Sequence, residues 1–110
     1  MGIRIVAAAG SVRPGNFTSK GLALVVDELE RHQEVTVDVI DIAAARLALP
    51  GQPPSDETPR IQQLVSDATA VILATPEYHG SYSSVIKLFI ENLGFPSRLA
   101  GKPVCPGVAV

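Results

Sequence analysis

Cysteine, tryptophan and long apolar runs are what this sequence has least of. Its 110 residues include one cysteine, Cys105, and no tryptophan. A single cysteine forms no internal disulfide and no cysteine-rich metal site, so we expect Cys105 to be a small buried apolar residue on a strand. No apolar stretch approaches the roughly 20 residues that a membrane helix needs, and no signal-peptide pattern follows Arg4. These absences make a cytoplasmic protein the default expectation.

Charge is also scarce, because only 18% of the residues are charged and the formal net charge is −2. This balance argues against a basic surface for nucleic acids, and no run of like charges suggests an interaction tail. The length fits a single globular domain over residues 1–110, and 46% of the residues are hydrophobic. We therefore expect neither nucleic acid nor membrane as a partner.

Apolar strands alternate with amphipathic helices along the chain. Continuous apolar runs at 3–9 and 70–75 predict central strands, and the alternating 35–40 predicts an edge strand. A fourth strand begins at 104 and runs to 110, although Pro106 and Gly107 are unusual inside a strand. The sequence predicts a parallel α/β sheet in the order 2-1-3-4, with helices on both faces. The pattern ends in its fourth strand, so we expect the chain to be truncated there or completed by another chain.

Three helices are predicted between these strands. The first is capped by Thr18 and buries a stripe of Leu22, Val25, Val26 and Leu29. The second is capped by Thr58 with Pro59 at its first position, after a long connection over residues 43–57. The third, at 85–93, has an apolar face wide enough to need cover from the sheet and from a partner subunit.

The first polar loop, residues 10–18, lies between a buried strand and a helix N-terminus, where free N–H groups favour anions. Ser11, Asn16 and Thr18 add neutral donors, Arg13 adds a planar cation, and the loop contains no acidic residue. Its spacing fits neither a P-loop nor a dinucleotide fingerprint. This composition favours a phosphomonoester, and the alternative is an ordinary turn with a surface arginine. Asp41, after the second strand, favours a loop or capping role over ribose binding.

The second polar loop, residues 75–83, holds both tyrosines of the chain, Tyr78 and Tyr82. Pro76 stiffens it, and Gly80 allows the backbone to approach a flat ligand. His79 favours a solvent-facing position over a catalytic base. In parallel sheets ligands bind where the strand order reverses, which here is between the first and third strands. The two loops are therefore expected to meet around one ligand.

Together the two loops resemble those of the NADPH-dependent FMN reductase family, whose fold is flavodoxin-like. Gly10, Ser11 and Arg13 match its G-S-x-R-x-x-S-x-N loop, with Asn16 and Thr18 at its last two named positions. Pro76, Glu77, Tyr78 and Ser81 match its P-E-Y-x-x-S stretch. The match runs along essentially all 110 residues. The family's domain is longer, with a glycine-rich loop after the fourth strand and a fifth strand, both missing here.

The resemblance implies an FMN site made from both loops, with NADPH or NADH as co-substrate. The phosphate would lie on Ser11, Arg13, Asn16, the Phe17 main chain and Thr18. The isoalloxazine ring would lie against Pro76, Glu77, Tyr78, His79, Gly80, Ser81 and Tyr82. The resemblance also implies a homodimer or homotetramer through the helix at 84–94.

The implied function is transfer of hydride from NAD(P)H to the flavin and on to free flavin or a small acceptor such as a quinone. The cofactor carries this chemistry, so no catalytic protein acid or base is expected. Two alternatives are a flavodoxin-type electron carrier and a ligand-free fragment without activity. NAD(P)H oxidation by the flavin-loaded protein separates the reductase from the carrier, and FMN-dependent thermal stabilisation separates both from the fragment.

Overall fold

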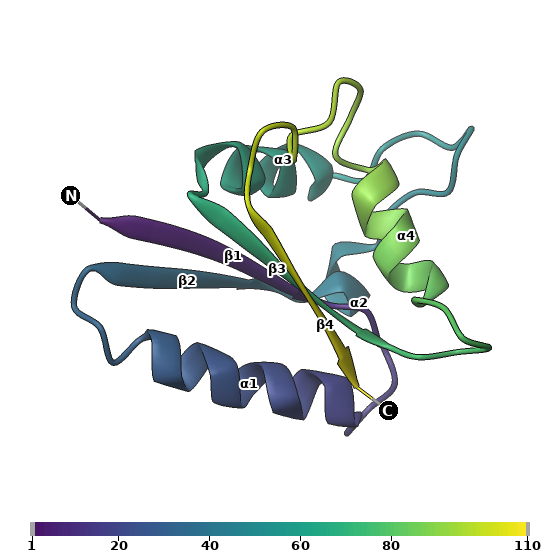
Figure 1. The fold of residues 1–110 in the computed structure, drawn as a ribbon. Helices are drawn as coiled ribbons and strands as arrows, with labels where there is room; N and C mark the ends of the chain where they lie inside the picture. Colours follow the sequence, from purple (N-terminus) through teal and green to yellow (C-terminus); the bar gives the residue numbers. More distant parts are fainter. Residues whose placement is uncertain (1, 110) are drawn as a thin grey trace.

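The computed structural model describes residues 2–109 and contains one four-stranded parallel sheet (Figure 1). The strands are β1 (Ile3–Ala9), β2 (Val35–Ile40), β3 (Ala70–Pro76) and β4 (Val104–Ala109). They lie in the order β2-β1-β3-β4, which confirms the predicted topology. Ile5 of β1 pairs with Val37 on one side and Ala70 on the other, so β1 is central and buries its residues 5–8.

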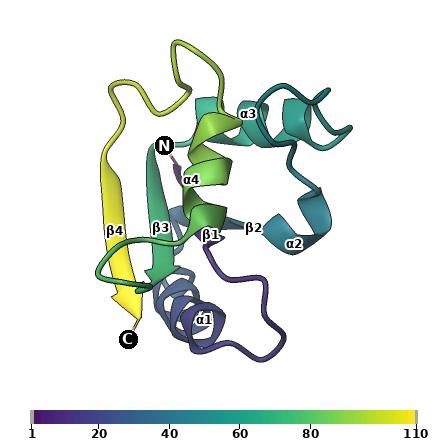
Figure 2. The same ribbon diagram turned by 90° about the vertical axis from the view of Figure 1, so that its right-hand side faces the viewer.

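Helices cover both faces of the sheet, which confirms the three-layer arrangement (Figures 1 and 2). Helix α1 (Phe17–Leu29) lies on one face, and α2 (Ile42–Ala45), α3 (Thr58–Asp67) and α4 (Ser84–Glu91) lie on the other. The larger core cluster lies under the last three helices, and a smaller one joins Leu22 and Val26 of α1 to Ala7. None of the helices within residues 2–109 is long and apolar enough to cross a membrane.

The long connection after β2 contains a helix that the sequence analysis placed in a loop. Asp41 caps α2, because its Oδ1 accepts hydrogen bonds from the N–H groups of Ala43 (3.1 Å) and Ala44 (3.4 Å). Arg46 ends the helix in the left-handed conformation, with φ 51°. The capping role expected for Asp41 is therefore confirmed, and its carboxylate is held at this helix.

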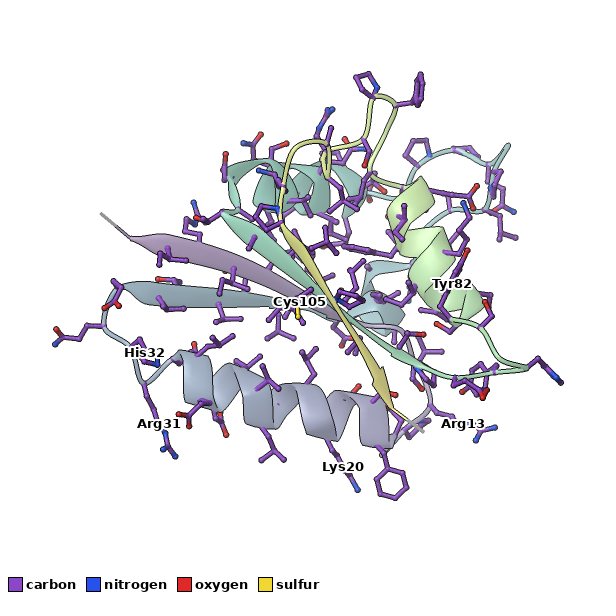
Figure 3. The ribbon with its side chains drawn as sticks, in the orientation of Figure 1. Arg13, Lys20, Arg31, His32, Tyr82 and Cys105 are labelled. Atoms are coloured by element: carbon purple, nitrogen blue, oxygen red, sulfur yellow. The ribbon has the colours of Figure 1, made fainter. Side chains whose placement is uncertain are left out.

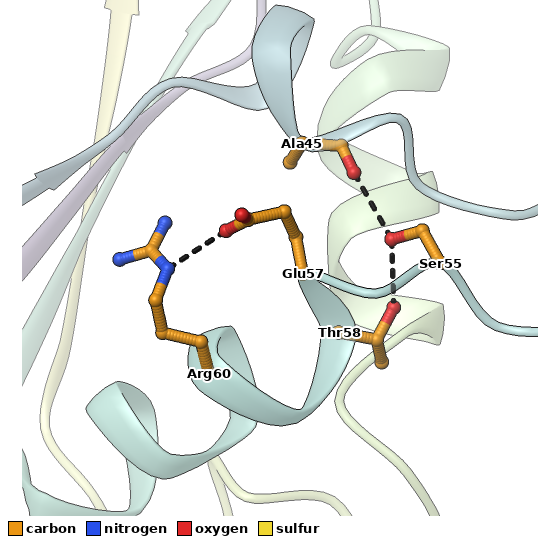
Figure 4. Close-up of polar contacts among 5 residues, drawn as sticks. All are labelled: Ala45, Ser55, Glu57, Thr58 and Arg60. Carbon is orange, nitrogen blue, oxygen red and sulfur yellow. Dashed lines mark hydrogen bonds and ion pairs between the residues drawn. The ribbon is translucent and has the colours of Figure 1, made fainter.

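Helix α3 begins one residue earlier than predicted, and Thr58 lies inside it. Glu57 is its N-cap and makes no capping bond through its side chain. The Thr58 hydroxyl instead lies 3.2 Å from Ser55 Oγ, which donates to Ala45 O at 3.0 Å (Figure 4). The expected Thr58 cap is wrong because this hydroxyl ties the helix start to α2.

The wide apolar face of α4 is largely covered within the chain itself. Ile86, Phe89 and Leu93 are buried, and Val85 and Ile90 pack against the same core. The helix is shorter than predicted, since it ends at Glu91 and Leu93 lies beyond it. The apolar pattern of this segment therefore reports burial in its own domain and does not by itself indicate a partner subunit.

The α1 face of β4 is less covered than the sequence analysis expected. Cys105 is exposed, which contradicts the prediction of a buried residue, and Val25 of α1 is 47% exposed. Both lie at an apolar hollow of about 260 Å³ between α1 and the sheet. The prediction failed because β4 is an edge strand, and α1, although it reaches β4, leaves this hollow open above Cys105. The edge position also explains why Pro106 is tolerated in a strand.

Candidate functional site

The first loop turns tightly from the end of β1 into α1. Gly15 takes a positive φ of 67° at the turn, which favours glycine. Asn16 then caps the helix: its Oδ1 accepts from Ser19 N at 2.7 Å, and its Nδ2 donates to Arg13 O at 2.7 Å. The predicted Thr18 cap is wrong, because α1 already begins at Phe17 and Thr18 is buried in its first turn.

Several backbone N–H groups of this loop have no acceptor in the described part of the chain. Within residues 2–109, the structure gives no hydrogen-bond acceptor to the N–H groups of Ser11, Val12, Gly15 and Phe17. The adjacent N-terminus of α1 adds a partial positive charge. Arg13 is exposed, and its guanidinium makes no ion pair with the described residues; Figure 3 shows it at the edge of the molecule. The loop is therefore equipped to receive an anion.

The second loop satisfies many of its polar groups internally. Tyr78 and Ser81 exchange two backbone hydrogen bonds of 3.0 and 3.1 Å, and the Glu77 carboxylate accepts from Gly80 N at 3.2 Å. His79 and Gly80 form the tip of the turn, with φ values of 53° and 76°. This closed turn is a preformed platform, and it leaves the Tyr78 and Tyr82 side chains about half exposed.

A cavity of about 410 Å³ separates the two loops. Eight of the predicted site residues line it: Ser11, Arg13, Asn16, Phe17, Thr18, Pro76, Glu77 and Tyr78. Pro14 and Gly15, which were not predicted as site residues, complete the lining. The remaining predicted residues, His79, Gly80, Ser81 and Tyr82, lie further along the same second loop, outside this lining. The structure thus places the hydrogen-bond donors of the first loop opposite the start of the second loop, with one cavity between them.

A buried polar network beside the cavity was missed by the sequence analysis. Ser83, the N-cap of α4, donates from Oγ to Gly10 O at 2.6 Å and accepts from Ile86 N at 3.2 Å. Its own N–H donates to Thr75 Oγ1 at 2.9 Å. A serine just before an apolar helical stripe is a recognisable cap signal, but its bond to Gly10 joins residues far apart in sequence. This network connects the bases of both loops.

The described residues contain no cluster of metal-binding side chains. Among residues 2–109, no three histidine, cysteine, aspartate or glutamate side chains lie together in a way that would hold a metal ion. The charged side chains that line the cavity are Arg13 and Glu77. The arrangement suits binding of an anionic organic ligand by hydrogen bonds, a helix N-terminus and one cation.

Comparisons with known proteins point the same way as the two loops. A family model described as NADPH-dependent FMN reductase matches residues 3–110. An FMN-dependent NADPH-azoreductase of Staphylococcus haemolyticus (strain JCSC1435) is 32% identical over 92 residues, which cover 76% of this chain and 48% of the relative. This chain therefore spans about half the length of that curated relative.

Solved structures share the fold. The apo form of an NADH:FMN oxidoreductase aligns with a TM-score of 0.81 and 24% identity, over 96% of this chain and 57% of its own. FerB, a flavoenzyme NAD(P)H:(acceptor) oxidoreductase from Paracoccus denitrificans, aligns with a TM-score of 0.78 and 21% identity, over 96% of this chain and 60% of its own. At these identities the likeness establishes the architecture of the sheet and helices.

Proposed function

The chain belongs to the NADPH-dependent FMN reductase family, and on that premise we propose that it binds FMN between its first and second loops. We propose further that the bound flavin takes hydride from NAD(P)H and passes it to free flavin or to a small acceptor such as a quinone. One observation carries the proposal. The first loop has N–H groups with no acceptor among the described residues and an exposed Arg13, and it lines one cavity together with the second loop.

The first loop fits the phosphate of FMN. A phosphate monoester offers several acceptor oxygens and a negative charge. The N–H groups of Ser11, Gly15 and Phe17 have no acceptor among the described residues, and they surround the N-terminus of α1. Arg13 supplies a planar pair of donors and one positive charge in water-exposed surroundings. Such groups bind a phosphate without any rearrangement of the helix start.

The second loop fits a flat ring system. Its closed turn fixes the backbone from Glu77 to Ser81, so its outward-facing edge keeps one shape before and after binding. Tyr78 lines the cavity and is half-exposed, so its ring is available to a flat ligand. Glu77 holds the turn through Gly80 N. In this proposal Glu77 shapes the platform and exchanges no proton with the ligand.

The residues of the chain bind and orient, and the cofactor supplies the redox chemistry. FMN, when bound, accepts hydride from a nicotinamide and gives reducing equivalents to an acceptor. Arg13 and the α1 N-terminus would hold the phosphate end, and the second loop would lie against the ring system. The half-exposed Tyr78 and Tyr82 leave the approach to this loop open to small co-substrates.

The proposal includes a homodimer or homotetramer through residues 84–94, which rests on the family resemblance, and a cytoplasmic location, which rests on the sequence patterns alone. The exposed side of α4 available for an interface carries Lys87 and Glu91, whose charged groups lie 4.0 Å apart. Light scattering on the purified chain tests the assembly. A monomer at all concentrations would contradict the oligomer and leave the flavin proposal standing.

A titration with FMN tests the function. We expect a shifted flavin absorbance spectrum that stays with the protein through gel filtration, followed by NAD(P)H oxidation in the presence of free FMN or a quinone. A flavin spectrum without NAD(P)H oxidation would favour the electron carrier instead. A protein that keeps no flavin, and whose thermal midpoint does not change with FMN, would contradict the proposal.

A further inference from the structure

Ser83 is buried between the two loops and lies outside the lining of the cavity. Ser83 is 2% exposed and lies at the junction between the second loop and α4. The hydroxyl donates to Gly10 O at 2.6 Å and accepts from Ile86 N at 3.2 Å. One oxygen therefore links the end of β1 to the start of α4.

Gly10 is held from two directions at the point where the first loop begins. Its N–H donates to Ala74 O of β3 at 2.6 Å, and its carbonyl accepts from Ser83. A Cβ atom at this position would lie 2.7 Å from Ser83 Oγ and closer still to Ile86. The close approach of Ile86 and Ser83 thus requires glycine at residue 10, and the hydrogen bond from Ser83 fixes the direction of the Gly10 carbonyl.

The direction of that carbonyl sets the direction of the next N–H group. In a planar trans peptide the C=O and the following N–H point in opposite directions. Because Gly10 O points to Ser83, the N–H of Ser11 points away from α4. Ser11 lines the cavity, and its N–H has no acceptor within residues 2–109. Ser83 therefore orients the first donor of the anion-binding loop.

Thr75 fixes Ser83 in turn. Its Oγ1 accepts from Ser83 N at 2.9 Å and donates to Pro76 O at 2.8 Å, and Thr75 is buried at 7% exposure. The residues on both sides of the second loop are thereby joined to each other and, through Ser83, to the first loop. A buried network in which every member has partners is rigid, and its geometry does not change with solvent.

We propose that Ser83 is a positioning residue that sets the Ser11 N–H and the separation of the two loops for a phosphorylated flavin. It acts through Gly10 and does not touch the ligand. This inference rests on the proposed FMN site. It predicts that loss of the hydroxyl weakens recognition of the phosphate end more than recognition of the ring.

The test compares FMN with riboflavin, which has the same ring and no phosphate, on the Ser83→Ala protein. We expect FMN to bind about tenfold more weakly and riboflavin to change less than threefold, because one charge-assisted hydrogen bond is misplaced. Ser83→Thr keeps the hydroxyl and should restore FMN binding to within threefold of the wild-type value. Ser83→Cys keeps the size with a weak donor, so it should behave like the alanine variant, and it carries the test if that variant does not fold.

If Ser83 only stabilised the fold, its loss would change the affinities for FMN and riboflavin equally. It would lower the folded fraction and so weaken both ligands by the same factor, and that result would overturn the positioning role. It would also be overturned if Ser83→Thr bound FMN as weakly as Ser83→Ala. If the wild-type protein bound no FMN, the proposed function itself would fail, which separates the two failures.

Discussion

The two loops at the carboxyl edge of the sheet handle their polar groups in opposite ways. The second loop pairs its own: Tyr78 and Ser81 exchange backbone bonds, and Glu77 holds Gly80 N. The first loop has its helix cap, Asn16, but leaves Ser11 and Phe17 N–H groups without acceptors among the described residues. Because the half-buried Ser11 N–H needs a partner and the exposed Phe17 N–H can take one from outside the chain, the first loop is shaped as a receptor and the second as a platform.

This difference predicts two classes of variant. Substitutions in the second loop and at the shared base of the loops should lower the free energy of unfolding. Removal of donors from the first loop should lower ligand affinity and leave the fold intact. The predictions below run from the largest expected effect to the smallest.

Gly10→Ala should have the largest effect on the fold. The added methyl would clash with the Ile86 side chain and lie 2.7 Å from Ser83 Oγ, which overpacks a buried junction, so we expect the free energy of unfolding to fall by about 2–3 kcal/mol. Gly21→Ala is the matched control, because nothing lies within 4 Å of its added Cβ. That helical position should gain about 0.5–1 kcal/mol in urea denaturation. A Gly10→Ala protein as stable as the wild type would contradict the packing described here.

Gly80→Ala should strain the second loop. Its φ of 76° is unfavourable for a residue with a Cβ, and we expect a loss of about 1–2 kcal/mol in unfolding free energy. Gly51→Ala provides a control with φ 87° and open surroundings in a loop that does not line the cavity. Both variants should lose similar stability, but only Gly80→Ala should also weaken FMN binding. Equal FMN affinity in the two variants would contradict the proposal that the second loop supports the flavin ring.

Asn16 offers the smallest and most selective test, because it caps α1 beside the anion site. Asn16→Ala should cost about 1 kcal/mol of unfolding free energy through loss of the bond to Ser19 N. Asn16→Asp keeps the oxygen that accepts from Ser19 N but loses the Nδ2 donor to Arg13 O, so its stability should lie between those of the wild type and Asn16→Ala. The same variant should bind FMN more weakly, since it brings a negative charge to the first loop. If aspartate left FMN affinity unchanged, the phosphate would have to lie elsewhere.

The sheet order was predictable from sequence because β1 and β3 are continuous apolar runs that only a central position buries. Most residues of the cavity were also predictable, since Ser11, Arg13 and Tyr78 follow directly from loop composition and family resemblance. Helix starts were harder: Asn16 and Thr18 are both good caps, and only the turn at Gly15 decides between them.

Other features depend on contacts between distant residues. Cys105 lies on a strand as predicted, but its exposure depends on which helix covers β4, and no local pattern encodes that. The bond between Ser83 and Gly10 spans 73 residues and appears only when β1, β3 and α4 are assembled. The residues that shape the site without lining it are therefore the ones that sequence analysis misses.

The most direct test measures FMN and riboflavin binding to the wild-type and Arg13→Ala proteins as a thermodynamic cycle. Arg31→Ala serves as the control, because Arg31 lies just beyond the C-terminal end of α1, away from the first loop (Figure 3). We predict that the wild type prefers FMN by about tenfold or more, and that Arg13→Ala loses most of this preference with riboflavin binding unchanged. An Arg13→Ala protein that still prefers FMN as strongly as the wild type would contradict the assignment of the first loop as the phosphate site.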